Sequence, residues 1–234
     1  MTVKALVFDV FGTVVDWRNS VAREVAAAAR RIGVETDGVA LADAWRAEYA
    51  PSMDRVRRGE LRWTTVDVLH RSALDALLPR FGLGALDAAA RAHLNRAWHR
   101  LDPWPDSVAG LRRLSHRYTL ATLSNGNVAL LADMAKRARL PWDVILSAEL
   151  FGHYKPDPEV YDGACRLLDL APPQVMMVAA HNGDLHAASA RGLRSGFVAR
   201  PTEYGPMQAK DLAADGAWDV VCASFAELAG ALGC

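Results

Sequence analysis

A single carboxylate at the end of an apolar run is the first group in the chain that could do covalent chemistry. Residues 4–8 read Lys-Ala-Leu-Val-Phe, and they lead directly into Asp9. Such a run predicts a buried parallel strand with the acid at its carboxyl end, where open α/β sheets build their sites. A carboxylate held there can act as a covalent nucleophile. The alternative is that Asp9 only caps the following turn.

The residues directly after Asp9 limit its chemistry. Phe11 stands two places further on, and a phenyl ring can neither donate a proton nor hold a water molecule. Gly12 and Thr13 then predict a turn, where the Thr13 hydroxyl and nearby backbone N–H groups could steady the carboxylate. Taken alone, Thr13 is equally typical of an ordinary turn.

Ser124 and Asn125 follow a second apolar run, residues 118–123, and stand just before Gly126. Both residue types are favoured at the start of a helix, so they are candidate helix caps. Donors at a strand end that starts a helix also point toward the crevice at the edge of the sheet. Capping and binding are therefore compatible here.

Lys155 precedes two prolines in the run Lys-Pro-Asp-Pro, so its backbone path is restricted. Most lysines are solvated surface charges, but a fixed lysine could offset repulsion between Asp9 and an anionic substrate. A further apolar run, residues 175–179, leads to His181, Asn182 and Asp184. His181 is either a structural residue or a base or hydrogen-bond donor, and we favour the second because imidazole relays protons near neutral pH.

The composition excludes several classes of protein. The chain has 234 residues, is 51% hydrophobic and carries no net charge, which suits one large domain or a domain with an insertion. No basic tract indicates a nucleic-acid partner, and no apolar stretch approaches the ~20 residues of a membrane helix. The start of the chain does not resemble a secretory signal, and the three cysteines are scattered without CxxC spacing. We therefore expect a cytoplasmic protein without disulfides.

Most of the chain alternates between strand-like and helix-like segments, which predicts right-handed crossovers and a mainly parallel sheet. The stretch between Asp16 and Leu101 differs, because it is rich in Ala, Arg, Leu and Trp and has no convincing strand. It predicts four helices, with breaks at glycines and prolines that include Pro51. The later strands are expected at 118–123, 143–146, 175–179, 196–199 and 219–222, and the inserted helices at 21–32, 39–49, 63–78 and 86–98.

Four short runs of the chain resemble, in the same order, the four motifs of the haloacid dehalogenase superfamily. They are the run from Asp9 to Thr13, the Ser-Asn-Gly run, the Lys-Pro-Asp-Pro run and the stretch that ends at Asp184. The chain resembles the L-2-haloacid dehalogenase branch, which carries an aromatic residue at the position of Phe11. That resemblance implies a Rossmann-like α/β core with an inserted all-helical cap. We expect the core at residues 1–15 and 102–234, and the cap at 16–101.

The resemblance also implies roles for individual residues. Asp9 would be the nucleophile, and Asn125 would donate to the departing halide. Arg46 belongs to a Trp-Arg pair like that of the dehalogenase cap, where the Arg reaches the halide and the substrate carboxylate. Tyr161 matches a position that lines the site, although it could equally be a core aromatic. The expected catalytic residues are Asp9, Thr13, Lys155, His181 and Asp184, and the expected substrate- or halide-binding residues are Phe11, Arg46, Ser124, Asn125, Tyr161 and Asn182.

Two acids of the metal-dependent superfamily members are missing. Phe11 replaces the general acid, and Ala180 stands where a magnesium ligand is expected, four residues before Asp184. A methyl group cannot bind a cation that requires oxygen ligands. We therefore expect no metal and no cofactor. The stretch also departs from the usual dehalogenase pattern, with His181 for Asn and Gly183 for Trp, which leaves the substrate and halide preference open.

These observations predict hydrolysis of short 2-haloalkanoic acids to 2-hydroxy acids through an aspartyl ester. The first alternative is a magnesium-dependent phosphatase on the same fold. The second is a non-catalytic binding module, because a fold does not fix a function. The expected partner is a small haloacid, and the family resemblance suggests a homodimer.

Overall fold

The computed structural model describes residues 2–234 and divides the chain into two compact units. The first unit is Met1–Asp16 with Pro103–Cys234, and the second is Trp17–Asp102. Each boundary lies one residue from the one expected for the core and the insertion. We call them the α/β unit and the helical unit.

A six-stranded sheet forms the centre of the α/β unit, with the strand order β5-β4-β1-β6-β7-β8. Every neighbouring pair in this sheet runs parallel, as the alternating pattern predicts. A second sheet pairs two short strands, β2 (Val15–Asp16) and β3 (Asp102–Pro103). The strands of the large sheet are β1 (Ala5–Phe8), β4 (Thr119–Ser124), β5 (Val144–Ser147), β6 (Val175–Ala179), β7 (Arg194–Val198) and β8 (Val220–Cys222).

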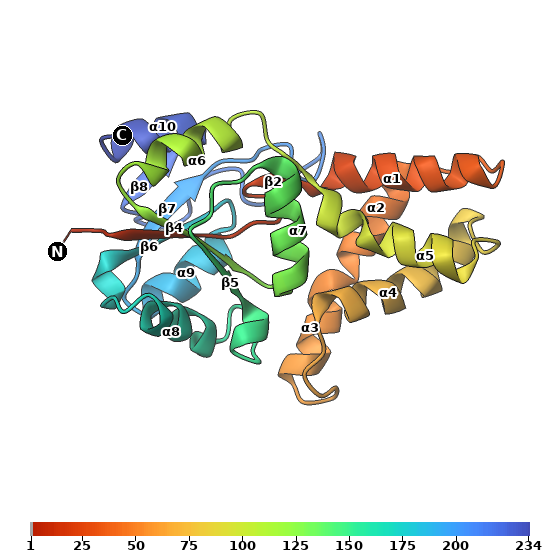
Figure 1. Ribbon diagram of the computed structural model, residues 1–234, viewed down its shortest axis with the longest axis horizontal. Coiled ribbons are helices and arrows are strands. Elements are labelled where there is room, and N and C mark those ends of the chain that lie inside the picture. The colour runs from red at the N-terminus through yellow and green to blue at the C-terminus, as the bar shows by residue number, and fades with distance from the viewer. Residues whose placement is uncertain (1) are drawn as a thin grey trace. The chain divides into compact units, whose positions relative to one another are not determined.

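Helices cover both faces of this sheet, with α6 and α10 on one side and α8 and α9 on the other (Figure 1). Residues 5–8 are consequently fully buried. This explains why β1 is apolar throughout instead of alternating. The helices are α6 (Ser107–Ser115), α7 (Val128–Ala138), α8 (Pro158–Leu167), α9 (Asn182–Ala190) and α10 (Phe225–Ala231), with short 3₁₀ turns at Ala148–Leu150 and Pro172–Gln174.

The register of the sheet brings three strand ends to one edge. Phe8 in β1 pairs with Thr122 in β4 and with Val178 in β6. The chain places β4 and β5 on one side of β1 and β6 to β8 on the other, so the order of the strands reverses beside β1. Open α/β sheets bind ligands at such a switch point, outside the carboxyl ends of the strands.

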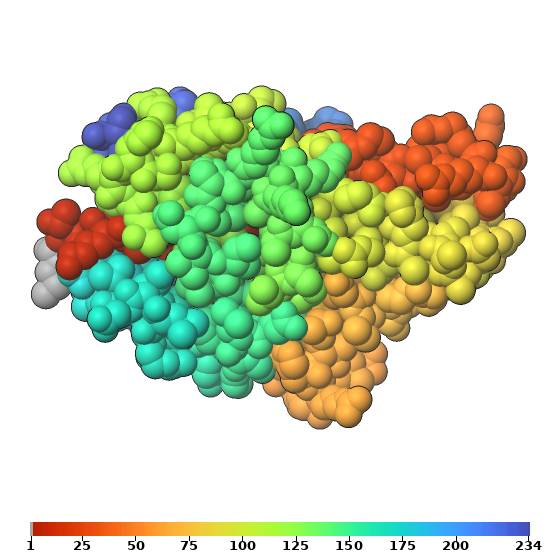
Figure 2. All heavy atoms as spheres, in the orientation of Figure 1, coloured from red at the N-terminus to blue at the C-terminus, as the bar shows by residue number. Residues whose placement is uncertain are grey.

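The helical unit packs five helices around a core rich in aromatic residues. Trp45 donates its indole N–H to the backbone carbonyl of His70 at 2.9 Å, and the His70 ring stacks on Trp98 with 4.3 Å between ring centroids. Figure 2 shows the first and last of these helices side by side on the surface of the unit. They are α1 (Trp17–Arg31), α2 (Gly38–Ala47), α3 (Tyr49–Arg57), α4 (Val66–Leu77) and α5 (Ala88–Asn95), with 3₁₀ turns at Leu78–Phe81 and Arg96–Arg100.

The expected number of helices in this unit was wrong. The sequence predicts four helices with a break near Pro51, but the unit has five, and Pro51 lies within the additional helix, α3. It occupies the first turn of that helix, where a backbone N–H has no partner within the helix and proline is therefore tolerated. Within residues 2–234, no helix is long and apolar enough to cross a membrane.

Candidate active site

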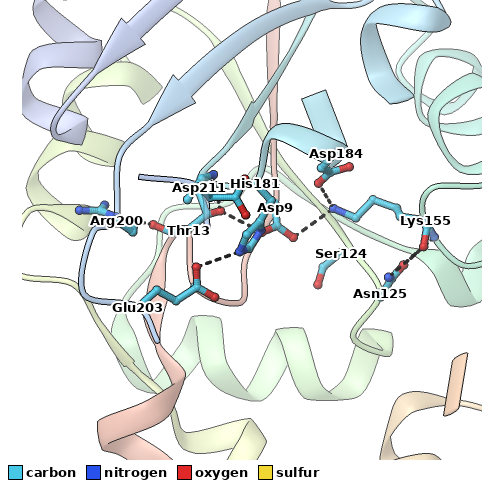
Figure 3. A network of polar contacts seen from close by, with 12 residues as sticks. Asp9, Thr13, Ser124, Asn125, Lys155, His181, Asp184, Arg200, Glu203 and Asp211 are labelled. Atoms are coloured by element: carbon cyan, nitrogen blue, oxygen red, sulfur yellow. Dashed lines mark hydrogen bonds and ion pairs between the residues drawn. The ribbon is translucent and has the colours of Figure 1, made fainter. Parts of the chain in front are cut away.

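The candidate catalytic residues of the α/β unit meet at the carboxyl edge of the sheet. Asp9 directly follows β1, Ser124 ends β4, and His181 comes two residues after β6. Lys155 reaches the same place from the loop before α8 (Figure 3). Segments that lie far apart in the sequence thus surround one carboxylate.

The two oxygens of Asp9 have different partners. Thr13 donates its hydroxyl to Asp9 Oδ2 at 2.9 Å, and Lys155 donates from Nζ to Oδ1 at 3.0 Å. The backbone N–H of Ala180 donates to the Thr13 hydroxyl oxygen, also at 2.9 Å. Because that oxygen already accepts a hydrogen bond, its own proton is directed at Asp9. The Asp9 side chain is 11% exposed, so it is held in place but still accessible.

Lys155 lies between two carboxylates. Its Nζ is 3.0 Å from Asp9 Oδ1 and 2.5 Å from Asp184 Oδ2, and Tyr161 donates its hydroxyl to the other oxygen of Asp184 at 2.6 Å. Burial would lower the pKa of Lys155, but Asp184 and Asp9 together raise it above its usual range. Burial would likewise raise the pKa of Asp9, and Lys155 and His181 hold it well below its usual range. The lysine is therefore an ammonium and Asp9 is a carboxylate at neutral pH.

The pKa of Asp184 is raised, in contrast to that of Asp9. Burial is the largest cause and raises its pKa, and the charge of Asp9 adds to this, while Lys155 opposes it. A carboxylate with a raised pKa is a better proton acceptor near neutral pH than an ordinary one. Tyr161 stays a phenol, because burial and the charge of Asp184 raise its pKa. Its expected place at the site is therefore matched by a contact with Asp184.

His181 lies between Asp9 and a residue that the sequence analysis missed, Glu203. Its Nδ1 is 3.0 Å from Asp9 Oδ2, and its Nε2 is 2.8 Å from Glu203 Oε2 (Figure 3). Burial opposes a charge on the ring, but Glu203 and the hydrogen bond to Asp9 outweigh it and raise the pKa of His181 to about 10. The sequence analysis expected His181 to act as a base or as a hydrogen-bond donor. The geometry supports the donor, because an imidazolium has no lone pair with which to accept a proton.

Glu203 and Arg200 come from the irregular segment after β7, and both are buried. Arg200 donates to the backbone carbonyl of Thr13 at 2.9 Å and to both carboxylate oxygens of Asp106 at 2.9 and 3.1 Å. This segment is thereby fixed to the turn that follows Asp9. The sequence contains no signal for these contacts, because the segment has neither a periodic pattern nor a motif around Glu203.

Gly12 makes room for Glu203. Its φ is +84°, which favours glycine, and a Cβ built at this position would lie 2.1 Å from Glu203 Oε1. The glycine of the turn is thus required both by its backbone conformation and by the carboxylate packed against it.

Asn125 holds the backbone of Lys155. Its Oδ1 accepts a hydrogen bond from Lys155 N at 2.7 Å, and its amide nitrogen lies 3.4 Å from the Lys155 carbonyl oxygen. Ser124 accepts a hydrogen bond from Gly126 N at 3.1 Å and so shapes the turn at the end of β4. The buried ring of Phe11 packs on the same Gly126, 3.1 Å from where a Cβ would stand.

Two further expected binding residues are Asn182 and Arg46. Asn182 uses its side chain to fix the segment after β7, since it donates to Asp211 Oδ1 and accepts from Trp218 Nε1 at 2.9 Å. This geometry favours a structural role for Asn182 over the expected binding role. Arg46 lies in α2 of the helical unit, with its guanidinium carbon 4.2 Å from the centre of the Tyr49 ring.

The residues around Asp9 are a poor match for a divalent cation. Phe11 and Ala180 add no oxygen ligand beside it, and Lys155 and His181 already neutralise its charge. Mg²⁺ requires oxygen ligands in a strict geometry, which this set does not supply. Within the described residues, side chains spaced to share a metal ion occur at His153, Asp157 and Glu159.

Comparisons with known proteins agree with this geometry. A family model for haloacid dehalogenase-like hydrolases matches residues 3–190. An (S)-2-haloacid dehalogenase of Pseudomonas sp. (strain CBS-3) is 32% identical over 217 residues, which cover 86% of this chain and 88% of that protein. The solved L-2-haloacid dehalogenase PA0810 is 53% identical, with a TM-score of 0.95 and 98% of both chains covered. The defluorinating L-2-haloacid dehalogenase Rha0230 is 48% identical, with a TM-score of 0.97, covering 99% of this chain and 96% of that one.

The chain belongs to the haloacid dehalogenase-like hydrolases and, within them, to the L-2-haloacid dehalogenase family. The resemblance inferred from the four motifs is thereby confirmed, and so is the α/β fold. Membership does not by itself assign a role to any residue, so the roles proposed next rest on the geometry above.

Proposed function

We propose that the protein hydrolyses short 2-haloalkanoic acids to 2-hydroxy acids through an ester on Asp9, without a metal ion. The observation that carries this proposal is the asymmetric environment of the Asp9 carboxylate. Thr13 and His181 hold Oδ2, and Oδ1 faces the ammonium of Lys155. A charged and positioned carboxylate of this kind is suited to nucleophilic attack. The three similar proteins named above are L-2- or (S)-2-haloacid dehalogenases, and their names support the same substrate class.

In the first step, Oδ1 of Asp9 attacks C2 of the substrate from the side opposite the halogen. The C–O bond forms as the carbon–halogen bond breaks, and the electron pair leaves with the halide. A halide leaves as a stable anion and needs no proton, which agrees with the phenyl ring of Phe11 where phosphatases have an acid. Back-side attack inverts C2, so an (S) substrate gives an (R) product.

Donors are required where negative charge develops on the halide. We assign this role to Asn125 and Arg46. Asn125 lies at the carboxyl edge of the sheet, beside Lys155. Arg46 is included because of the Trp-Arg pair in the helical unit, which we propose acts as a cap over the site. A cap would exclude bulk water, which otherwise weakens a carboxylate nucleophile.

In the second step, water attacks Cγ of the Asp9 ester. One proton of the water passes to Asp184 and on to the departing alcohol oxygen as the Cγ–Oδ1 bond breaks. The other proton is released to solvent when the Asp9 carboxylate is restored. Asp184 is the proposed base because its pKa is raised and because Lys155 and Tyr161 fix both of its oxygens. The product alcohol therefore carries an oxygen that came from Asp9.

A single turnover in ¹⁸O-labelled water tests this route. With enzyme in excess over chloroacetate, the heavy oxygen should enter the peptide that contains Asp9 and be absent from the glycolate. Heavy oxygen only in the product would mean direct attack by water and would overturn the proposal. A parallel reaction with fluoroacetate tests whether the enzyme also releases fluoride, as the name of the defluorinating dehalogenase Rha0230 states for that protein.

Two controls separate this proposal from the phosphatase alternative. EDTA should leave halide release unchanged, and phosphate esters should not be hydrolysed with or without Mg²⁺.

Asp9→Asn keeps the size of the side chain but removes its charge, and it should abolish halide release. A requirement for magnesium would contradict the metal-free mechanism.

We further propose that the protein acts in the cytoplasm as a homodimer, which is the assembly that the family resemblance implies. Light scattering coupled to size-exclusion chromatography tests the assembly. A mass of one chain would contradict it.

A further inference from the structure

His181 lies in a chain of polar contacts that continues beyond the residues expected from the motifs. One ring nitrogen faces Asp9 Oδ2 and the other faces Glu203 Oε2, at 3.0 and 2.8 Å. Both carboxylates accept hydrogen bonds, so both ring nitrogens donate and the ring is an imidazolium. A ring in this state cannot take a proton from water.

Asp9 Oδ2 is therefore held by two donors, the Thr13 hydroxyl and the His181 ring. In the ester, Oδ1 is bonded to the substrate carbon and Oδ2 is the carbonyl oxygen. When water adds to Cγ, the electron pair of that carbonyl moves onto Oδ2, so the negative charge develops between these two donors. Donors aimed at developing charge are a main source of catalysis in acyl transfer.

Formation of the ester removes the charge of Asp9 and so removes one of the two carboxylates that stabilise the imidazolium. Glu203 is the remaining one. Its side chain is 1% exposed and packs against Gly12, so its position is fixed. Without Glu203, the ring would tend to release its proton at the stage when the proton is needed.

We propose that Glu203 is a positioning residue that keeps His181 doubly protonated after the ester has formed, so that Thr13 and His181 together hold the negative charge on Asp9 Oδ2 during hydrolysis. This inference rests on the proposed ester route and extends it. The protons of the hydrolysis step move as described above, because His181 keeps its own proton throughout. His181 is then a catalytic residue of the second step, although it is not the base.

Other charged groups near the ring do not replace Glu203. Lys155 contacts the other oxygen of Asp9, and Asp184 contacts Lys155. Arg200 donates to the backbone carbonyl of Thr13, beside which it lies in Figure 3, and to the Asp106 carboxylate. The pKa of His181, raised to about 10 by Glu203 and Asp9 against the effect of burial, is consistent with this arrangement.

The inference is tested with Glu203→Gln, which keeps the size of the side chain and removes its charge. Rapid-quench kinetics with chloroacetate measure halide release and loss of the Asp9 ester separately. We expect halide release to change by less than about threefold and ester hydrolysis to slow by about tenfold or more, so that the ester accumulates. The rate of ester hydrolysis should fall at high pH, where His181 loses its proton. This alkaline limb of the pH–rate profile should move to lower pH by at least about one unit in Glu203→Gln.

Three comparisons make the result decisive. Glu203→Asp retains the charge and should keep the alkaline limb near its wild-type position. Glu159→Gln removes an exposed carboxylate and should change neither step. In the wild-type protein, ¹⁵N NMR of the His181 ring should show both nitrogens protonated at pH 8, a measurement that does not depend on the folding of any variant.

A neutral His181 ring at pH 8 would overturn the inference. The inference would also be overturned if Glu203→Gln hydrolysed the ester at the wild-type rate and with the alkaline limb at its wild-type pH. If hydrolysis in the wild type accelerates with pH as the ring loses its proton, His181 is a base and the inference is wrong. Absence of any Asp9 ester in the wild type would overturn the proposed function together with this inference, whereas an ester with unaltered Glu203→Gln kinetics overturns the inference alone.

Discussion

The side chain of Asn125 fixes the backbone of Lys155, with 2.7 Å between Asn125 Oδ1 and Lys155 N. The residue proposed to bind the departing halide thus also positions the loop that carries the cation. Loss of Asn125 therefore affects both groups, and an experiment has to separate them.

We expect Asn125→Ala to slow halide release by about 10²–10³, the usual effect of losing one preorganised donor. If the amide acts on the halide, the loss should be larger for chloroacetate than for bromoacetate, because chloride is the poorer leaving group and needs more stabilisation. Equal losses for the two substrates would mean that Asn125 acts only through Lys155. Single-turnover measurements of halide release, made on the wild type and on Asn125→Ala with each substrate, give the two losses of rate to be compared.

Lys155→Met should destabilise the α/β unit by about 3–5 kcal/mol at pH 7, because it leaves Asp9 and Asp184 buried without their shared cation. The pKa of Asp184, already raised, should rise further when Lys155 is removed. A carboxylate whose pKa is higher in the folded than in the unfolded state loses stability as pH rises. The difference between Lys155→Met and the wild type in the free energy of unfolding, measured with urea, should therefore become smaller as pH falls toward 4.

Lys136→Met provides the control for that prediction, because Lys136 is exposed in α7. It should unfold like the wild type at every pH. A difference between Lys155→Met and wild type that stays constant between pH 7 and pH 4 would contradict the assigned charges.

Gly12→Ala should displace Glu203, since the new Cβ would lie 2.1 Å from its carboxylate oxygen. The φ of +84° adds backbone strain of about 1–3 kcal/mol. Gly33→Ala is a matched control, because Gly33 has a φ of +68° and no atom within 4 Å of a built Cβ. Both variants should lower the melting temperature, but only Gly12→Ala should slow ester hydrolysis.

His70→Phe should stabilise the helical unit, most strongly at acid pH. No hydrogen-bond partner for either His70 ring nitrogen is found among residues 2–234, and burial lowers the pKa of His70 to about 3. The unfolded chain then binds more protons than the folded one between about pH 6.5 and 3, so stability is lost as pH falls through that range. The phenyl ring keeps the stacking on Trp98 and removes this dependence.

Urea unfolding of His70→Phe at pH 7 and pH 5 checks this prediction. The variant should gain about 1–3 kcal/mol, the cost of a buried polar group without a partner, and the gain should be larger at pH 5. His116→Phe alters an exposed histidine and should show no such gain.

Much of this site could be predicted from the sequence because its parts are local. Asp9, Ser124 and Asp184 each follow an apolar run that forms a parallel strand, and such strands end at one edge of the sheet. Period and composition sufficed to locate the strands of the six-stranded sheet and the helical insertion, but not the short strands β2 and β3. The break assigned to Pro51 was wrong because proline is typical of both a loop and the first turn of a helix.

The contacts of Glu203 and Asn182 could not be predicted in the same way. Each depends on where the irregular segment after β7 lies, and neither residue type nor spacing gives that position. Asn182 is next to His181 in sequence, yet its side chain bonds to Asp211 and Trp218. Proximity to a motif is therefore a weak guide to the direction of a side chain.

The position of Glu203 in the chain has a consequence for engineering. The match to the family model ends at residue 190, whereas Glu203 follows β7 in the segment beyond it. With the role proposed for Glu203, a substitution in this segment changes the charge state of the imidazole while Asp9, Ser124 and Asp184 are left as they are. Turnover can thus be altered from a stretch of chain that the family model does not cover.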